Sequence, residues 1–193
     1  MRGVPSAVAA ALLALVAAAT PATARVLLTV DEALALAFPG AAIERGTIFP
    51  TPAQLESASR LAGEKILATI VHPYVARQDG AVVGTAYFDV HVVRTLAETV
   101  MVTVDPAGKI GRIEVLSFDE PPEYLPRTPW YRQFDGRPLD AELELQRAIR
   151  PVAGATLTAR ATTDAARRVL ALHRALAEAA PAEPPAAPPA KPR

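Results

Sequence analysis

The chain has 193 residues, 20 basic and 20 acidic side chains, and no cysteine. A chain of this length is expected to form one domain and to bury roughly 70% of its unfolded surface, so it needs no metal or disulfide to fold. The absence of cysteine excludes disulfides, iron–sulfur clusters, c-type haem attachment and cysteine-linked lipid. The neutral charge balance argues against nucleic acid as a partner.

The first 24 residues have the pattern of a Sec-type secretory signal peptide. Arg2 precedes an unbroken Ala/Val/Leu run over residues 7–19, and small residues then stand where an A-x-A cleavage site requires them. The run is short for a membrane span, although an uncleaved N-terminal anchor is the alternative. Cleavage after Ala24 would place a chain starting at Arg25 in an extracytoplasmic, periplasmic compartment.

The last residues differ in composition from the rest of the chain. Six of the 19 prolines lie in residues 181–193, and such a segment cannot form a strand ladder or a core. We therefore expect a single domain over residues 25–178, followed by a disordered Pro/Ala-rich tail over 179–193.

Two short helices and a series of strands are predicted in the first part of the body. Thr29 begins a helix that stops at Pro39-Gly40, and Thr51 with Pro52 begins a second that Gly63 closes. Consecutive β-branched or alternating segments separated by tight turns predict an antiparallel meander. These segments are residues 66–75, 81–93, 98–104 and 109–116.

An aromatic, proline-stiffened loop and a long helix complete the body. Residues 119–139 contain five prolines together with Tyr124, Trp130, Tyr131 and Phe134. These rings either pack over the sheet or form a wall against a flat ligand. A helix follows from Thr156 or Thr158 to Glu178. Strands followed by a helix indicate an α+β fold, with the meander packed by this amphipathic helix and the short N-terminal ones.

One face of that last helix is predicted to pack on the sheet. Its apolar residues recur at helical spacing, with charged residues on the opposite face and an Asp164–Arg168 pair at i, i+4. The predicted packing face consists of Leu157, Ala161, Ala165, Val169, Leu172 and Leu176.

The segment that carries chemistry is the turn before this helix. Gly154 and Ala155 permit close approach to the backbone, and the helix N-terminus favours an anion. Thr156 and Thr158 present hydroxyls at the same place. Without further information, an ordinary threonine N-cap is the favoured interpretation of this segment.

The segment resembles the covalent flavinylation motif of the FMN-binding domain family. That family includes the C subunit of sodium-pumping NADH:quinone reductases and the G subunit of Rnf complexes. Its motif reads Asp-x-x-Ser/Thr-Gly-Ala-Thr/Ser-x-Thr/Ser before a helix, and Gly154, Ala155, Thr156 and Thr158 match it. The resemblance extends over about residues 80–176, with a strand–Asp-x-x-Gly-Lys-Ile hairpin at 104–110 and Glu120-Pro-Pro in place of the family's Glu-Thr-Pro-Gly.

The resemblance implies FMN as cofactor, esterified through its phosphate to Thr156 by a flavin transferase of the ApbE type that uses FAD and a divalent metal. A phosphodiester there keeps one negative charge beside the helix N-terminus, and Thr158 either donates to the same phosphate or caps the helix. The cofactor-binding residues implied in this way are Thr156, Gly154, Ala155, Leu157, Thr158, Ala153, Arg150, Glu120 and Tyr124.

Two positions depart from the motif. Ala153 stands where the family has Ser/Thr, and Arg150 stands where it has Asp. A transferase that recognises this Asp would modify the chain poorly. In that case a divergent transferase would be needed to modify it. Alternatively, Arg150 offers a cation to the phosphate and supports non-covalent FMN.

These features predict an FMN electron carrier rather than a stand-alone enzyme, working with redox partners that include membrane-bound ones. The alternatives are a non-covalent FMN protein or small reductase, and a cofactor-free binding or scaffold domain with a decayed flavin site. His72, His91 and His173 share no metal-ligand spacing. His91 is expected at a solvated strand end or facing the flavin, and His173 is expected to be structural.

Overall fold

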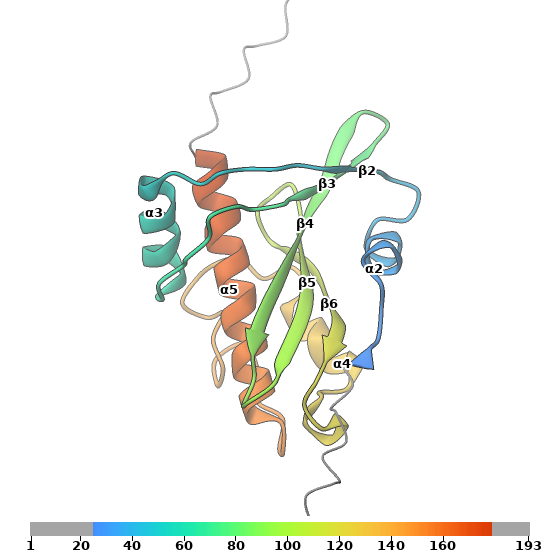
Figure 1. Cartoon of the computed structure of the whole chain (residues 1–193), viewed down its shortest axis with the longest axis vertical. Coiled ribbons are helices and arrows are strands. Elements are labelled where there is room, and N and C mark those ends of the chain that lie inside the picture. The colour runs from blue at the N-terminus through green and yellow to red at the C-terminus, as the bar shows by residue number, and fades with distance from the viewer. Residues whose placement is uncertain (1–24, 179–193) are drawn as a thin grey trace, which may run out of the picture.

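The computed structural model describes residues 25–178, and the predicted signal peptide and tail lie outside these residues. Six strands form one antiparallel sheet in the order β1-β6-β5-β4-β3-β2 (Figure 1). The predicted meander is confirmed, because the four consecutive strands β3 to β6 are neighbours in the sheet. Two short edge strands, which the sequence analysis did not predict, extend it on either side. The strands are β1 (Arg25–Val26), β2 (Ala42–Arg45), β3 (Tyr74–Gln78), β4 (Ala81–Val92), β5 (Ala97–Val104) and β6 (Ile110–Phe118).

The two predicted short helices are present and begin at the predicted residues. Helix α2 (Val30–Ala37) follows Thr29, and α3 (Pro52–Ala62) follows Thr51; each threonine forms a complete capping box with the third helical residue. Gly63 ends α3 with φ of 82°, the left-handed conformation that glycine adopts without cost.

The strand predicted over residues 66–75 is wrong for most of its length. Regular pairing with β4 begins only at Tyr74, and the preceding residues form an extended loop that makes one isolated bridge, between Ile48 and Val71. Ile66 is buried against α3 and α5, so its apolar character serves helix packing. Pro73 lacks the N–H that a central strand position requires.

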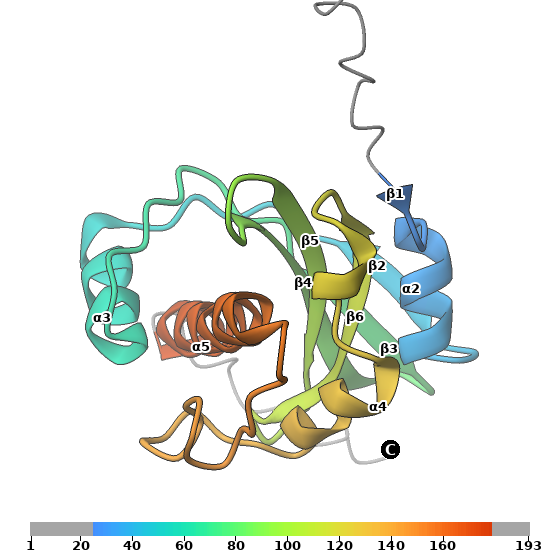
Figure 2. The same ribbon diagram turned by 90° about the horizontal axis from the view of Figure 1, so that it is seen from below.

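The helices cover both faces of the sheet. Helix α5 (Thr156–Glu178) lies along the inner face of the curved sheet with α3 on its far side, while α2 lies on the outer face (Figure 2). The main core joins α5 to β4, β5 and β6, and Leu34 of α2 packs in a smaller cluster with Met101 of β5. The α+β class is therefore confirmed. Within residues 25–178, no helix has the length and apolar character needed to cross a membrane.

The aromatic loop contributes to both the core and the surface. It contains η1 (Pro122–Tyr124), α4 (Thr128–Tyr131) and η2 (Arg132–Phe134). Tyr131 and Phe134 are buried in the main core and Trp130 packs against it, whereas Tyr124 is only partly buried. Three of the four rings thus pack in or against the core, while Trp130 and Tyr124 both remain partly exposed.

The packing face of α5 differs from the prediction at its N-terminal end. Leu157 is 48% exposed, while Thr158, Thr162 and Thr163 are buried. The threonine hydroxyls make internal hydrogen bonds, so a polar side chain can occupy the interface. The predicted Asp164–Arg168 pair is also wrong, because the Arg168 guanidinium binds Asp89 at 2.7 Å and Glu64 at 2.8 Å.

Candidate functional site

A cavity of about 160 Å³ lies at the N-terminus of α5. It is lined by the helix start, by Arg94 from the β4–β5 hairpin and by Tyr124 from η1. The structure therefore brings together six of the sequence-predicted residues around this cavity. One is Tyr124, and the other five belong to the helix start: Gly154, Ala155, Thr156, Leu157 and Thr158.

The helix start leaves backbone donors free. A turn in which Ala155 N–H donates to Val152 C=O at 3.1 Å leads into α5, and Gly154 occupies its left-handed position with φ of 82°. Within residues 25–178, the N–H groups of Thr156, Leu157 and Thr158 have no acceptor. Three free N–H groups at the positive end of a 23-residue helix form an anion-binding site.

The two motif threonines have different surroundings. Thr156 is exposed, and its hydroxyl donates a hydrogen bond of 3.3 Å to Val152 C=O. Thr158 is 1% exposed, and its hydroxyl donates to Tyr124 C=O at 2.6 Å. The two roles predicted for Thr158, donating to the phosphate and capping the helix, are therefore wrong, because this hydroxyl already joins η1 to α5.

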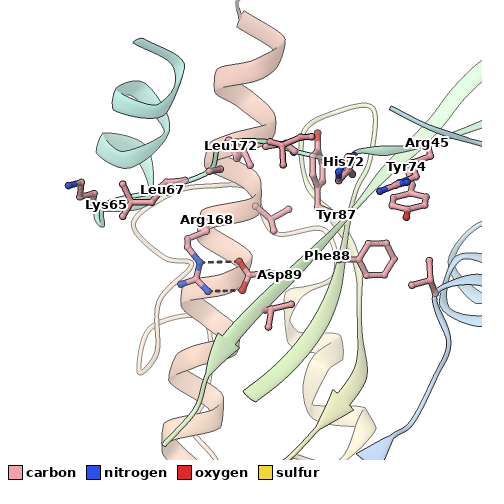
Figure 3. Close-up of a pocket in the computed structure, with 17 residues that line it drawn as sticks. Arg45, Lys65, Leu67, His72, Tyr74, Tyr87, Phe88, Asp89, Arg168 and Leu172 are labelled. Carbon is pink, nitrogen blue, oxygen red and sulfur yellow. Dashed lines mark hydrogen bonds and ion pairs between the residues drawn. The ribbon is translucent and has the colours of Figure 1, made fainter. Parts of the chain in front are cut away.

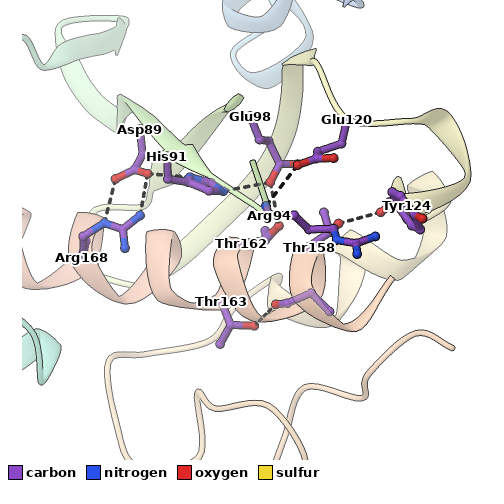
Figure 4. A network of polar contacts seen from close by, with 11 residues as sticks. Asp89, His91, Arg94, Glu98, Glu120, Tyr124, Thr158, Thr162, Thr163 and Arg168 are labelled. Carbon is purple, nitrogen blue, oxygen red and sulfur yellow. Dashed lines mark hydrogen bonds and ion pairs between the residues drawn. The ribbon is translucent and has the colours of Figure 1, made fainter. Parts of the chain in front are cut away.

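Arg94 is the cation of the cavity, and the sequence analysis did not select it. Its guanidinium lies 4.7 Å from the ring centroid of Tyr124 (Figure 4). Glu120 does not line the cavity but holds the hairpin that carries Arg94. One Glu120 oxygen accepts hydrogen bonds from the N–H groups of Arg94, Thr95 and Leu96 at 3.2, 2.7 and 2.9 Å. These bonds, chiefly those from Thr95 and Leu96, lower the pKa of Glu120.

Arg150 and Ala153 do not line the cavity either. The backbone of Arg150 is held by the aromatic loop: its C=O accepts from Trp130 Nε1 at 2.7 Å and its N–H donates to Gln133 Oε1 at 3.0 Å. Ala153 is exposed in the turn. The cation expected from Arg150 is supplied instead by Arg94, a residue of the β4–β5 hairpin that lies 62 positions before Thr156 in the chain.

A buried ionic network lies beside the cavity. His91 of β4 places Nδ1 2.9 Å from Asp89 and Nε2 2.9 Å from Glu98 of β5, and Arg168 of α5 binds Asp89 (Figure 4). The expectation of a solvated His91 is therefore wrong. Since both ring nitrogens donate to carboxylates, the ring is an imidazolium. Thr162, one turn beyond Thr158, donates to Glu98 at 3.4 Å.

The pKa values of this network follow from the opposed effects of burial and pairing. Burial disfavours the charged form of His91, but its hydrogen bonds to Asp89 and Glu98 outweigh burial and raise the pKa of His91 to about 9. Burial likewise disfavours the charged form of Asp89, and the hydrogen bonds from His91 and Arg168 lower its pKa to about 2. His91 and Asp89 are therefore both charged at neutral pH.

The other histidines have structural contacts. His173 Nδ1 lies 2.9 Å from the hydroxyl of Tyr87, as expected for a structural residue, and His72 Nδ1 lies 3.2 Å from the hydroxyl of Thr47. In the part of the chain that the structure describes, no group of three or more His, Asp or Glu side chains is placed to hold a metal ion.

The donor set of the cavity fits a phosphate group. Three free N–H groups, the exposed hydroxyl of Thr156 and the guanidinium of Arg94 are all donors, and no carboxylate lines the cavity. The fold and the site are those of an α+β domain with an anion-binding helix N-terminus.

The comparison with known families identifies a similar domain. Residues 97–171 match the family model of an FMN-binding domain. The match confirms the resemblance seen in the motif and gives FMN as the cofactor, which supports a role in electron transfer. The matched segment includes Glu120, Tyr124 and the motif threonines, whereas Arg94 precedes it. No curated protein matches the chain.

Proposed function

We propose that this protein is an extracytoplasmic electron-transfer flavoprotein whose FMN phosphate is esterified to Thr156 Oγ1. The exposed hydroxyl of Thr156, next to three free N–H groups and Arg94, is the observation that carries this proposal. The phosphodiester would keep one negative charge facing these donors. Thr158 is a poor acceptor in comparison, because its hydroxyl is buried and bonded to Tyr124 C=O.

The attachment step is a phosphoryl transfer without oxidation or reduction. Thr156 Oγ1 forms a bond to the FMN phosphorus of FAD, the phosphoanhydride bond to AMP breaks, and the hydroxyl proton passes to solvent. A flavin transferase of the ApbE type with its divalent metal is the proposed partner. The Thr156 hydroxyl loses only a long hydrogen bond of 3.3 Å when it reacts.

The cavity of about 160 Å³ suits the phosphate, and the flavin ring needs further space. A second cavity of about 200 Å³ shares Leu157 with the first and lies between α5 and the end of β4. Val92 and Leu157, 61% and 48% exposed, offer apolar surface to a ring there, and Arg160 offers a cation. We therefore place the ring over this groove, beside the His91 network.

Mass spectrometry tests the covalent link. The chain is co-expressed with a flavin transferase, and its intact mass and proteolytic peptides are compared with those of the matched variants Thr156→Val and Thr158→Val. We expect one FMN adduct on the wild type and on Thr158→Val, and none on Thr156→Val. Circular dichroism checks that both variants fold. An adduct that persists in Thr156→Val would overturn the assignment.

Non-covalent FMN is the second candidate, and the position of Arg94 favours it. A guanidinium in the cavity wall supplies charge for binding a free phosphate, while Ala153 and Arg150 depart from the motif. In that case the protein is yellow on native gel filtration and loses its colour on denaturing gel filtration. A coloured denatured chain contradicts this candidate.

The proposed function also includes export of the protein and contact with redox partner proteins. The signal pattern over residues 1–24 supports export, and an exported chain would begin at Arg25. The intact mass of protein recovered from the periplasm tests this, because a chain that retains Met1 would contradict cleavage. The exposed groove beside Leu157 would allow redox partners, including membrane-bound ones, to approach the flavin.

A further inference from the structure

Strand β4 has an open edge that no other strand covers. Pairing of β3 with β4 stops at Tyr74 and Ala86, whereas β4 runs on to Val92 with β5 alone as its neighbour. The chain before β3 diverges toward α3 and pairs instead with the segment after β2, through Gly46–Pro73 and Ile48–Val71. The sheet therefore splits, and one side of the second half of β4 is left without a partner (Figure 2).

The hairpin after β4 fixes which backbone groups face this edge. Val93 N–H donates to Leu96 C=O at 3.1 Å, and hydrogen-bonded and non-hydrogen-bonded pairs alternate along an antiparallel ladder. The odd-numbered residues of β4 therefore bond to β5. Phe88, Val90 and Val92 direct their N–H and C=O groups outward, and within residues 25–178 these groups have no hydrogen-bond partner outside the ladder.

An open cavity of about 550 Å³ lies along this edge, where the sheet splits (Figure 3). Its apolar lining includes Leu67 and Val90, which are 80% and 70% exposed. Natural edge strands are usually protected by lysine, proline or a bulge, and the Phe88–Val92 segment has none of these. Asp89 and His91 do not protect it, because their side chains are engaged in the buried network.

The charge of the cavity selects the chemistry of its occupant. Arg45 and Lys65 line it on opposite sides, and neither has an ion-pair partner among the described residues (Figure 3). Arg45 lies 5.9 Å from the ring centroid of Tyr74 instead. The carboxylate in the lining, Asp89, is already paired with Arg168. The free charge of the cavity is therefore positive, which favours acidic side chains.

We propose that the Phe88–Val92 edge of β4 accepts an extended acidic segment of a partner protein as an added strand. Main-chain hydrogen bonds to Phe88, Val90 and Val92 would bind it, apolar side chains would contact Leu67 and Val90, and acidic ones would pair with Arg45 and Lys65. The chain's own residues 181–193 fit poorly, since six of them are prolines without an N–H donor.

Amide exchange measured by NMR on the full chain tests this proposal. The probe is a capped peptide, Glu-Asp-Val-Thr-Val-Thr-Val-Asp-Glu, and its binding is measured by titration calorimetry. We expect saturable binding that slows exchange at Phe88, Val90 and Val92, while the odd-numbered amides, already bonded to β5, do not change. Absence of saturable binding, or binding that leaves these three amides unchanged, overturns the proposal.

Two sets of variants make the test specific. Val90→Pro removes an outward N–H without breaking the ladder to β5, and it should weaken binding at least about tenfold, whereas Val90→Thr should not. Arg45→Glu with Lys65→Glu should reverse the preference toward a peptide with Lys in place of Glu and Asp. Equal affinity in Val90→Pro and Val90→Thr would contradict edge pairing.

The exchange data before peptide addition distinguish other occupants. Protection of the three amides that grows with protein concentration would assign the edge to a second copy of the chain. Protection already present at dilutions where the chain is monomeric would assign it to a segment of the same chain. Either result overturns a partner protein as the occupant.

Discussion

At the scale of single residues, the charge on His91 couples stability to pH. The pKa of His91 rises from 6.5 to about 9 on folding, so the folded state binds the proton more tightly than the unfolded chain does. The resulting stabilisation is complete below pH 6.5 and is lost as the pH rises through 9. The lowered pKa of Asp89 has its effect at acidic pH. Its contribution to the stability of the folded state is present above pH 3.8 and is lost as the pH falls toward 2.

Replacing His91 should therefore destabilise the protein mainly at pH values below the pKa that His91 has in the folded state. We expect His91→Gln to lower the free energy of unfolding by about 3 kcal/mol near pH 6, and the difference from the wild type to narrow near pH 10. Urea unfolding at the two pH values measures this. An equal difference at both values would mean that packing, not charge, is the contribution of His91.

Glu120 binds the backbone of the hairpin that carries Arg94. Its carboxylate accepts three adjacent N–H groups, so Glu120→Gln should accelerate hydrogen exchange at Thr95 and Leu96. Glu123→Gln is the matched control, because Glu123 is exposed on η1 and makes no such bonds. Unchanged exchange in Glu120→Gln would show that the hairpin is rigid without this charge.

At the scale of elements, Gly84 permits the contact between α2 and the sheet. A Cβ at this position would lie 2.6 Å from Cε1 of Phe38, the residue that ends α2, and 3.1 Å from Val104 C=O. β4 therefore passes directly beneath the Phe38 ring, and a side chain here would displace the helix end.

The Gly84→Ala variant should consequently lose about 2 kcal/mol of stability through overpacking. The double variant Gly84→Ala, Phe38→Leu should recover part of that loss, since it removes the ring atoms nearest the new methyl group. Thermal or urea unfolding of the wild type, of Gly84→Ala and Phe38→Leu alone, and of the double variant measures the coupling. If the losses of stability from Gly84→Ala and Phe38→Leu simply add, the Phe38 ring is not what prevents a side chain at position 84.

The elements that sequence analysis predicted correctly are those determined by neighbouring residues. Thr29 and Thr51 act within one helical turn, so their roles as N-caps can be predicted from the neighbouring residues. The Arg168–Asp89 pair joins residues 79 positions apart, and Glu120 reaches 24 to 26 positions back to the hairpin. Such pairings depend on how the sheet folds around α5, and patterns among neighbouring residues in the sequence do not predict them.

The same reason explains the residues that were misplaced. Leu157 was expected in the core because of helical spacing, yet the threonines of α5 occupy the interface through internal hydrogen bonds. Arg94 lacked a local motif, because its role comes from the hairpin bringing it opposite Thr156.

At the scale of the whole molecule, the fold should not depend on the terminal segments. The core joins α5 to the sheet, and every buried residue among those described lies between Ala33 and Leu176. We expect a chain of residues 25–178 to have a Tm within about 2 °C of that of the chain ending at residue 193, because neither core nor cap would be lost. Calorimetry of the two chains checks this, and a lower Tm for the shorter chain would show that residues 179–193 stabilise the domain.

The position of α5 at the end of the domain has a consequence for the order of events during synthesis. The inner face of the sheet stays uncovered until residues 156–178 have emerged, since Tyr87 meets His173 across 86 positions of chain. Contacts of such long range form late and slowly. Thr156, the proposed acceptor, acquires its neighbouring N–H donors only when that helix forms, so under this proposal flavin attachment would follow translation and folding. The nascent chain would thus need protection from aggregation before it can be loaded.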